Sequence, residues 1–148
     1  MAKIHAYLNF DGNCKEAFQF YEQVFNTSNL GTYLYDDMPA DPSHPPLPAD
    51  ANGKVMHTAI KINEDTMIMG SDIVEGFGHR LTTGNSTYIM LDTATAEEAQ
   101  AIHQLLSADA KLIEMNLEET FFAELYSSFQ DQFGIYWMIH FEGNKKMD

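Results

Sequence analysis

The alternation of apolar and polar positions predicts that the chain opens with a strand and continues into a helix. In the run KIHAYLNF, residues 3–10, apolar side chains occupy every second position, which is typical of a strand with two different faces. Asp11-Gly12 is a turn signal, and Asn13 with Glu16 three residues later resembles a capping box. Apolar residues then recur at helical spacing, which predicts a helix that covers one face of a sheet.

The same order of patterns appears a second time. Residues 86–92 (STYIMLD) predict a strand, and Thr95 with Glu98 repeats the capping signature before another helical stripe. Strand-like runs follow each predicted helix, at 30–35, 54–62 and 66–72 in the first half and at 111–115, 122–130 and 135–142 in the second. Each half is therefore predicted to run strand, helix, strand, strand, strand.

Two stretches lack a regular period. Residues 36–53 contain all five prolines of the chain and are predicted to form an irregular loop. Residues 73–85, which include His79 and Arg80, are predicted to connect the halves. We expect one α+β domain over residues 1–148, with a first module at about 1–75 and a second at about 86–142.

Composition narrows the classes of function. The 148 residues are 45% hydrophobic, as in a globular domain. Eight Lys plus Arg against 22 Asp plus Glu give a formal charge of −14, which disfavours nucleic acid and anionic membrane surfaces as partners. No apolar run approaches the roughly 20 residues of a spanning helix, and no signal-peptide pattern opens the chain. With a single cysteine, Cys14, the expectation is a soluble cytoplasmic protein.

Several local motifs, taken with their spacing, resemble one known superfamily. They are FDGNCKEAFQFY at 10–21, KVMHTAIKI at 54–62, the IMGSD strand end, and ETFFAELYSSFQDQFGIYWMIHFE at 119–142. Together with the duplicated βαβββ order, they resemble the PhnB-like branch of the vicinal oxygen chelate superfamily, which includes glyoxalase I, extradiol dioxygenases and bleomycin-resistance proteins. The resemblance implies two modules that form a cupped, mainly antiparallel sheet with helices on its outer face.

The resemblance also implies where a divalent metal would bind. Superfamily enzymes use four inward-facing strand positions, and these match His5, Met69 (or Gly70 one residue on), Ser86 or Thr87, and Met138. A catalytic ion needs at least three good donors, whereas thioethers are poor ligands for hard or borderline ions. We therefore expect no cofactor and no metal of the usual geometry, with His5 as a weak candidate ligand. Displaced ligands among His57, His140 and Asp72 leave a rescued site open.

The leading functional hypothesis is a small-molecule-binding protein whose cup suits an apolar or aromatic ligand. The candidate ligand-binding residues are His5, Tyr7, His57, Met69, Tyr88, Tyr136, Met138 and His140. For His5 the alternative is a half-buried histidine paired with a neighbouring strand, and for the methionines it is ordinary core packing. Residues Trp137, Ile139 and Phe141 are expected to pack under the helices while Tyr136, Met138 and His140 face the cup.

Further expectations concern alternative functions, self-association and Cys14. The runner-up function is a metal-dependent lyase, isomerase or dioxygenase with displaced ligands, and the third is a dimeric interaction protein without a ligand pocket. Branch members often carry a demethylubiquinone methyltransferase label, but the sequence shows no strand-turn-helix glycine fingerprint for a methyl-donor nucleotide, so we predict no methyltransferase. Relatives suggest a homodimer. Cys14 is expected to be an exposed bystander whose thiol pKa the helix dipole lowers somewhat.

Overall fold

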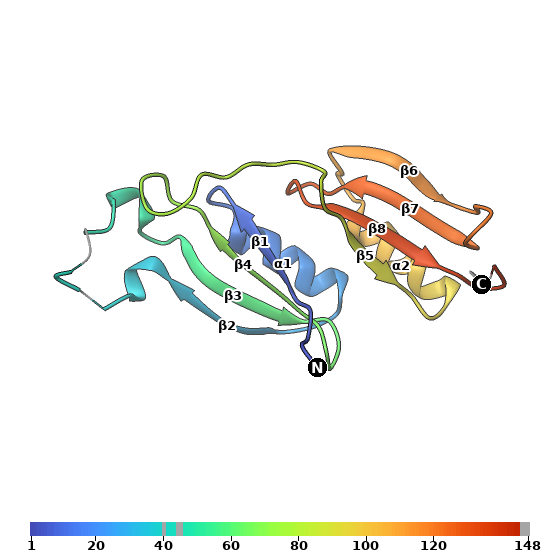
Figure 1. Cartoon of the computed structure of the whole chain (residues 1–148), viewed down its shortest axis with the longest axis horizontal. Coiled ribbons are helices and arrows are strands. Elements are labelled where there is room, and N and C mark those ends of the chain that lie inside the picture. Colours follow the sequence, from blue (N-terminus) through green and yellow to red (C-terminus); the bar gives the residue numbers. More distant parts are fainter. Residues whose placement is uncertain (40, 44–45, 146–148) are drawn as a thin grey trace. The chain divides into compact units, whose positions relative to one another are not determined.

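The computed structural model describes residues 1–39, 41–43 and 46–145 (Figure 1). The chain separates into two compact units, Met1–Thr82 and Thr83–Asp148. The first contains β1 (Ala6–Phe10), α1 (Cys14–Val24), β2 (Asn29–Leu34), β3 (Val55–Lys61) and β4 (Met67–Asp72). The second contains β5 (Ile89–Asp92), α2 (Ala96–Leu106), β6 (Leu112–Glu118), β7 (Leu125–Gln130) and β8 (Tyr136–Phe141).

Both units have the same sheet topology. The strand orders are β1-β4-β3-β2 and β5-β8-β7-β6, and in each sheet the first pair is parallel while the others are antiparallel. Each helix connects the two edge strands of its sheet, β1 to β2 or β5 to β6, and packs on one face of that sheet (Figure 1). The predicted α+β class with two βαβββ modules is confirmed.

Helix α1 packs closely on its sheet because one strand position carries no side chain. Phe18 and Tyr21 of α1 are almost fully buried, and Phe18 also contacts Phe10 of β1 edge to face, with ring centroids 6.1 Å apart. A Cβ on Gly70 of β4 would lie only 2.5 Å from the Phe18 ring. Glycine at this position therefore lets the helix approach the strand.

The two helices begin differently. Thr95 Oγ1 accepts the backbone N–H of Glu98 at 3.1 Å, as predicted, and Glu98 Oε1 accepts the N–H of Ala94 at 3.1 Å. Asn13 occupies the N-cap of α1 but its side chain makes no capping hydrogen bond to the described residues, so the predicted box at Asn13 and Glu16 is wrong. The carboxylate of Asp72 replaces it.

Asp72 ends β4 and is only 1% exposed. Its Oδ1 accepts the N–H groups of Gly12 at 3.0 Å and Cys14 at 2.9 Å, and its Oδ2 accepts that of Val55 at 2.9 Å. A negative charge beside the first turn of α1 also suits the helix dipole. One buried carboxylate thus fixes the start of the helix and the start of β3.

The predicted irregular stretches contain little regular structure. Within 36–53, the described residues form two short 3-10 turns, at Tyr35–Asp37 and Ala49–Ala51, while residues 40, 44 and 45 of this predicted loop lie outside the described part. Tyr35, Ala51 and Val74 form a small buried cluster that anchors the stretch. In the connector, an isolated bridge joins Val74 and Phe77.

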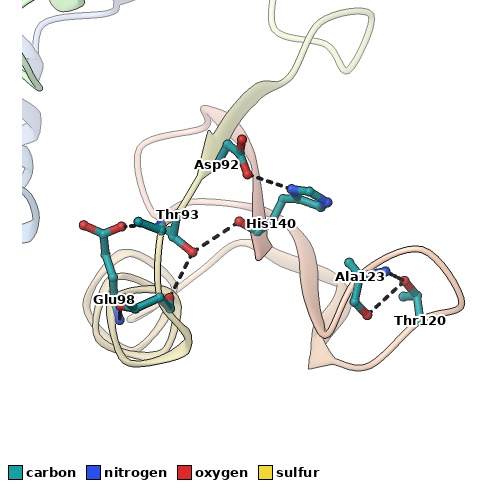
Figure 2. Close-up of polar contacts among 8 residues, drawn as sticks. Asp92, Thr93, Glu98, Thr120, Ala123 and His140 are labelled. Carbon is teal, nitrogen blue, oxygen red and sulfur yellow. Dashed lines mark hydrogen bonds and ion pairs between the residues drawn. The ribbon is translucent and has the colours of Figure 1, made fainter. Parts of the chain in front are cut away.

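Strand boundaries differ from the sequence pattern in both units, and the run predicted from residue 3 begins as β1 only at Ala6. The run predicted from residue 122 begins as β7 only at Leu125, because Thr120 Oγ1 accepts the N–H of Ala123 at 3.0 Å and that of Phe122 at 3.3 Å, which bends the chain (Figure 2). The run predicted from residue 86 begins as β5 at Ile89.

Candidate functional site

In the first unit, β1 and β4 place predicted site residues on the sheet face that α1 does not cover. Leu8 and Phe10 are buried on the helix side, whereas Tyr7 lies on the opposite face and is 47% exposed. Tyr7 pairs with Met69 of β4 across the parallel register. The ring of His57 on β3 lies 5.9 Å from that of Tyr7. This helix-free face therefore brings Tyr7, His57 and Met69 together.

His5 precedes β1 and is half-buried. Its Nδ1 accepts the backbone N–H of Met67, at the start of β4, at 2.9 Å. In the neutral ring the proton therefore lies on Nε2. The contact is the pairing with a neighbouring strand that the sequence left as the alternative for His5.

In the second unit, residues 136–140 of β8 alternate as predicted, whereas Phe141, which was expected to pack under the helices, is only partly buried. Trp137 and Ile139 are fully buried on the side that α2 covers, and the Trp137 Nε1–H donates to the buried carboxylate of Asp131 at 2.8 Å. Tyr136, Met138 and His140 occupy the helix-free face, where they are partly exposed. Met90 of β5 pairs with Met138 and is 51% exposed. A thioether pair thus spans the edge strand β5 and its neighbour β8 on this face.

Aromatic side chains surround Met138. The phenol of Tyr126, on the neighbouring β7, donates to Met138 Sδ at 3.1 Å. Towards the start of β8, the rings of Tyr88 and Tyr136 meet nearly edge to face with centroids 5.3 Å apart. Phe122 packs against Tyr126 at the other end, 5.0 Å between centroids. The described part of the face is thus apolar at its centre and aromatic at both ends.

Tyr88 reaches across this sheet to its far edge. Its hydroxyl donates to both oxygens of Glu114 on β6, at 2.7 and 2.9 Å, and Ser128 Oγ donates to Glu114 Oε1 at 2.7 Å. The hydrogen bond to Glu114, followed by desolvation and the carboxylate charge, raises the pKa of the Tyr88 phenol. Glu114 thereby fixes the orientation of the Tyr88 ring over the face.

His140 pairs with a carboxylate at the opposite end of the face. Its Nδ1 lies 2.9 Å from Asp92 Oδ1 across the parallel β5–β8 pair (Figure 2). The backbone of His140 is held as well, because its carbonyl oxygen accepts the N–H of Thr93 at 2.8 Å and the Thr93 hydroxyl at 3.2 Å. The His140 backbone is therefore anchored to the residue after β5, while the Asp92 side chain of the pair is 68% exposed.

The superfamily metal positions fit a divalent ion poorly. His5 already uses Nδ1 for a backbone N–H, and Met69 and Met138 offer only thioethers, with Met138 Sδ accepting the Tyr126 hydroxyl. Gly70, the alternative position, faces α1 and has no donor. Hard and borderline ions prefer imidazole and carboxylate ligands. Over residues 1–39, 41–43 and 46–145, no three His, Cys, Asp or Glu side chains form a group that could hold an ion.

The displaced ligands considered from the sequence do not all lie on one face of one unit. Asp72 is buried on the helix side, where three backbone N–H groups occupy it. His5 and His57 belong to the first unit and His140 to the second, so no single unit holds all three.

Cys14 is the clearest error of the sequence reading outside the candidate site. The side chain is fully buried rather than exposed. Burial, with smaller contributions from the charges of Asp72 and Glu16, raises the pKa of the thiol instead of lowering it. The helix dipole is outweighed because the thiolate would be desolvated beside a carboxylate.

Sequence reasoning missed Asp92 and Glu114. Both are partners of predicted residues across strands, and their pairing depends on register, which has no short-range signature. Asp92 lies two residues after Met90 and so on the same face, a signal that period-two parity contains once the strand is located. Glu114 has no such local signal, since it belongs to the strand at the far edge of the sheet.

Two hollows lie elsewhere in the first unit. One of about 510 Å³ is bordered by residues after β4, including Glu75, His79 and Arg80. Another hollow, of about 450 Å³, lies between α1 and the strands β2 and β3, and Phe18 of α1 and Thr58 of β3 are among the residues that border it. None of the predicted ligand-binding residues lines either hollow. No helix in the described part of the chain is long and apolar enough to span a bilayer.

Known proteins resemble the chain over nearly its whole length. Residues 2–140 match the family model described as 3-demethylubiquinone-9 3-methyltransferase. Protein YjdN of Escherichia coli (strain K12) is 30% identical over 138 residues, which cover 90% of this chain and 91% of YjdN. The crystal structure of PA1353 from Pseudomonas aeruginosa has a TM-score of 0.80 at 29% identity, with 96% of this chain and 98% of that one covered.

More distant structures extend the likeness of fold. The structure of the PhnB protein from Bacillus cereus has a TM-score of 0.73 at 24% identity, covering 95% of this chain and 99% of that one. The fosfomycin resistance protein FosX from Listeria monocytogenes has a TM-score of 0.62 at 11% identity, covering 94% and 91%. With two βαβββ units and a family match over residues 2–140, the chain belongs to the 3-demethylubiquinone-9 3-methyltransferase family, the PhnB-like branch with the glyoxalase-type fold.

Proposed function

We propose that the protein binds an apolar or aromatic small molecule on the helix-free face of its second sheet, without a metal at the usual superfamily positions. The proposal rests on the side chains that surround Met138. An adaptable thioether pair, Met90 and Met138, lies between the Tyr88–Tyr136 contact and the Phe122–Tyr126 contact. Thioethers and aromatic rings together favour flat apolar ligands.

Exposure supports a binding role over simple packing. Met90 is 51% exposed on the edge strand β5, on the sheet face that α2 does not cover. Exposed large apolar side chains on such a face often mark a binding surface. The chain's charge of −14 and the carboxylates of Asp92 and Glu114 argue against an anionic ligand. Because the apolar groups around Met138 also disfavour a buried cation, the proposed ligand is neutral and mainly apolar.

Methionine methyl groups provide the test. Protein labelled with ¹³C at methionine methyls is titrated with 1-methylindole in the presence of EDTA. The proposal expects saturable shifts at Met90 and Met138 and none at Met56, which packs against the Tyr35 cluster. Saturable shifts restricted to Met56, or no saturable shift up to the solubility limit, would contradict binding at this face.

A charge introduced into the face sharpens the result. Met138→Glu places a carboxylate among apolar groups, so it should weaken the binding of 1-methylindole at least tenfold. The matched control is Met38→Glu, because Met38 is 37% exposed and lies outside the proposed face. Equal losses in the two variants would show that net charge rather than the site governs binding.

The metal-independent part of the proposal has a separate test. Nickel, zinc, manganese and iron are added one at a time to protein purified without a histidine tag, and unfolding temperature and bound metal are measured. The poor donor set at His5, Met69 and Met138 predicts no stoichiometric metal. Tight binding of one ion that His5→Ala removes would instead support the metal-dependent alternative.

We also propose that the protein forms a homodimer. Strands β2 and β6 are sheet edges, and both expose apolar side chains, with Leu30 at 57% and Leu112 at 47%. Unpaired apolar edges favour pairing with a second copy. Sedimentation equilibrium should give twice the chain mass. A monomer at micromolar concentration would contradict this proposal without affecting the ligand proposal.

A further inference from the structure

The pair of Asp92 and His140 sets the tautomer of the histidine. A carboxylate can only accept a hydrogen bond, so the 2.9 Å contact between Asp92 Oδ1 and His140 Nδ1 requires a proton on Nδ1. A neutral imidazole has one proton on its two ring nitrogens. In the neutral ring, Nε2 therefore has a free lone pair and acts as a hydrogen-bond acceptor.

The ring is held in place from several sides. Phe122 stacks almost parallel to it, with 15° between the planes and 6.4 Å between centroids. Tyr126 meets it nearly perpendicularly, also at 6.4 Å. Thr93 holds the His140 carbonyl through both its N–H and its hydroxyl. These contacts fix the orientation of the ring, so Nε2 is available to a ligand without a rotation of the side chain or a shift of β8.

Nε2 itself has no hydrogen-bond partner in the part of the chain that the structure describes, while the side chain of His140 is 13% exposed. Figure 2 shows this nitrogen on the side of the ring turned away from Asp92. His5 shows the opposite arrangement, because its Nδ1 is the acceptor and its Nε2 has the proton. Of these two histidines, His140 is the one that offers an acceptor to a ligand.

Charges near the face restrict what that acceptor can meet. The strand partners of His140 include two titratable groups, Asp92 from β5 and Tyr126 from β7, and Glu114 lies at the other end of the face. Strands β5, β7 and β8 contain no lysine or arginine. A ligand that brings an anion would be repelled, whereas a neutral N–H or O–H group would gain a hydrogen bond.

We propose that the face around Met138 selects neutral aromatic molecules that have an N–H or O–H donor, and that His140 Nε2, oriented by Asp92, accepts this donor. The inference rests on the proposed ligand-binding function and adds the chemical class of the ligand. Asp92 acts as a positioning residue and His140 as the residue that contacts the ligand.

The tautomer can be measured without any ligand. Long-range ¹H–¹⁵N correlation spectra at alkaline pH, where imidazole is neutral, distinguish a protonated Nδ1 from a protonated Nε2. The wild-type protein is expected to show the Nδ1–H form at His140 and the Nε2–H form at His5. Asp92→Ala should move His140 towards the Nε2–H form and leave His5 unchanged. A wild-type His140 with its proton on Nε2 overturns the inference.

Ligand selection is measured with a matched pair of probes. Indole and 1-methylindole have similar apolar surfaces, but only indole has an N–H donor. We expect indole to bind about three- to tenfold more tightly than 1-methylindole, the range of one net hydrogen bond. His140→Phe retains a flat ring against Phe122 but removes the acceptor, so it should equalise the two affinities. Asp92→Ala should reduce the preference, whereas the exposed carboxylate variant Glu97→Gln should keep it.

The outcomes separate this inference from the proposed function. Equal wild-type affinities, with shifts at Met90 and Met138, would overturn the donor selection and leave the binding site in place. If His140→Phe binds neither probe, His140 contributes to binding by packing rather than by accepting a hydrogen bond, and the proposed selection of N–H donors is also overturned. An absence of saturable binding by either probe would contradict the proposed function itself.

Discussion

The two units build the same βαβββ topology but fix the starts of their helices by different means. Helix α2 is capped by Thr95 and Glu98, which lie within its own first turn or next to it. Helix α1 is capped by Asp72, which is 58 residues away from Cys14 in the sequence. The contrast shows that one fold can be specified locally in one half and by a tertiary contact in the other.

This difference also affects the neighbouring strands. In the first unit the Asp72 carboxylate joins the β1–α1 turn to the start of β3. In the second unit the buried carboxylate, Asp131, instead accepts the N–H groups of Phe133 and Ile135 within its own turn, as well as the Trp137 indole. The first unit should therefore depend more strongly on one residue than the second.

The largest predicted effect is that of Asp72→Ala. The change removes three charge-assisted hydrogen bonds and leaves buried N–H groups without a partner, so we expect a loss of about 3–5 kcal/mol in the free energy of unfolding. Urea denaturation measures the loss. Asp65→Ala is the control, because the side chain of Asp65 is 84% exposed and its ion pair with Lys3 is long, 3.7 Å. Similar losses in both variants would contradict the central role of Asp72.

A second change tests the close approach of α1 to β4. Gly70→Ala would place a methyl group 2.5 Å from the Phe18 ring, so the helix or the ring must move. We expect a loss of about 1–3 kcal/mol. Gly70→Ala combined with Phe18→Leu should recover part of that loss, because the smaller side chain makes room. If urea denaturation shows no change in the free energy of unfolding for Gly70→Ala, the Phe18 ring moves aside at no cost and the prediction is wrong.

A smaller effect compares the two caps directly. Thr95→Ala removes the acceptor of the Glu98 N–H and should cost about 1 kcal/mol. Asn13→Ala, at the equivalent position of α1, should cost less than about 0.5 kcal/mol, since its side chain makes no capping bond to the described residues. Equal costs at the two positions, measured by thermal unfolding, would mean that Asn13 caps its helix in solution.

The smallest predicted effect concerns His103 of α2. Helix α1 contains no histidine, so this effect is specific to the second unit. The Nε2 of His103 is buried without a partner among the described residues, its ring packs on Phe129, and burial lowers its pKa below the ordinary 6.5. The unfolded chain then binds a proton more readily than the folded chain, so stability is full above the ordinary value and is lost as pH falls through the lowered one. His103→Leu should flatten this loss between pH 7 and 5, in a range set by the histidine's ordinary pKa of about 6.5. An unchanged pH profile in the variant would assign the loss to other groups.

How much the sequence predicts follows from the range of each interaction. Periodicity located all eight strands and both helices, and it correctly placed Trp137 and Met138 on opposite faces of β8. It located the local cap at Thr95 because both partners lie within four residues. It failed at Asn13 and at Cys14, since the partner of the helix start is Asp72 and the thiol is buried beside it.

The candidate site shows the same limit. Its individual residues follow from strand parity, but the contacts that give them chemistry do not. The bond from Tyr88 to Glu114 joins the residue before β5 to the outer strand β6, and the pair of Asp92 and His140 joins residues 48 apart in the sequence. Strand order and register determine both contacts, and a short stretch of residues encodes neither.

The remote cap has a consequence for the order in which the first unit folds. The Cys14 N–H can meet Asp72 only after β4 has paired beside β1, which requires closure of a chain segment that includes the proline-containing stretch. The first turn of α2 needs no such closure. The Cys14 amide is therefore a reporter of the completed first sheet, and its exchange with solvent deuterium records when that sheet opens.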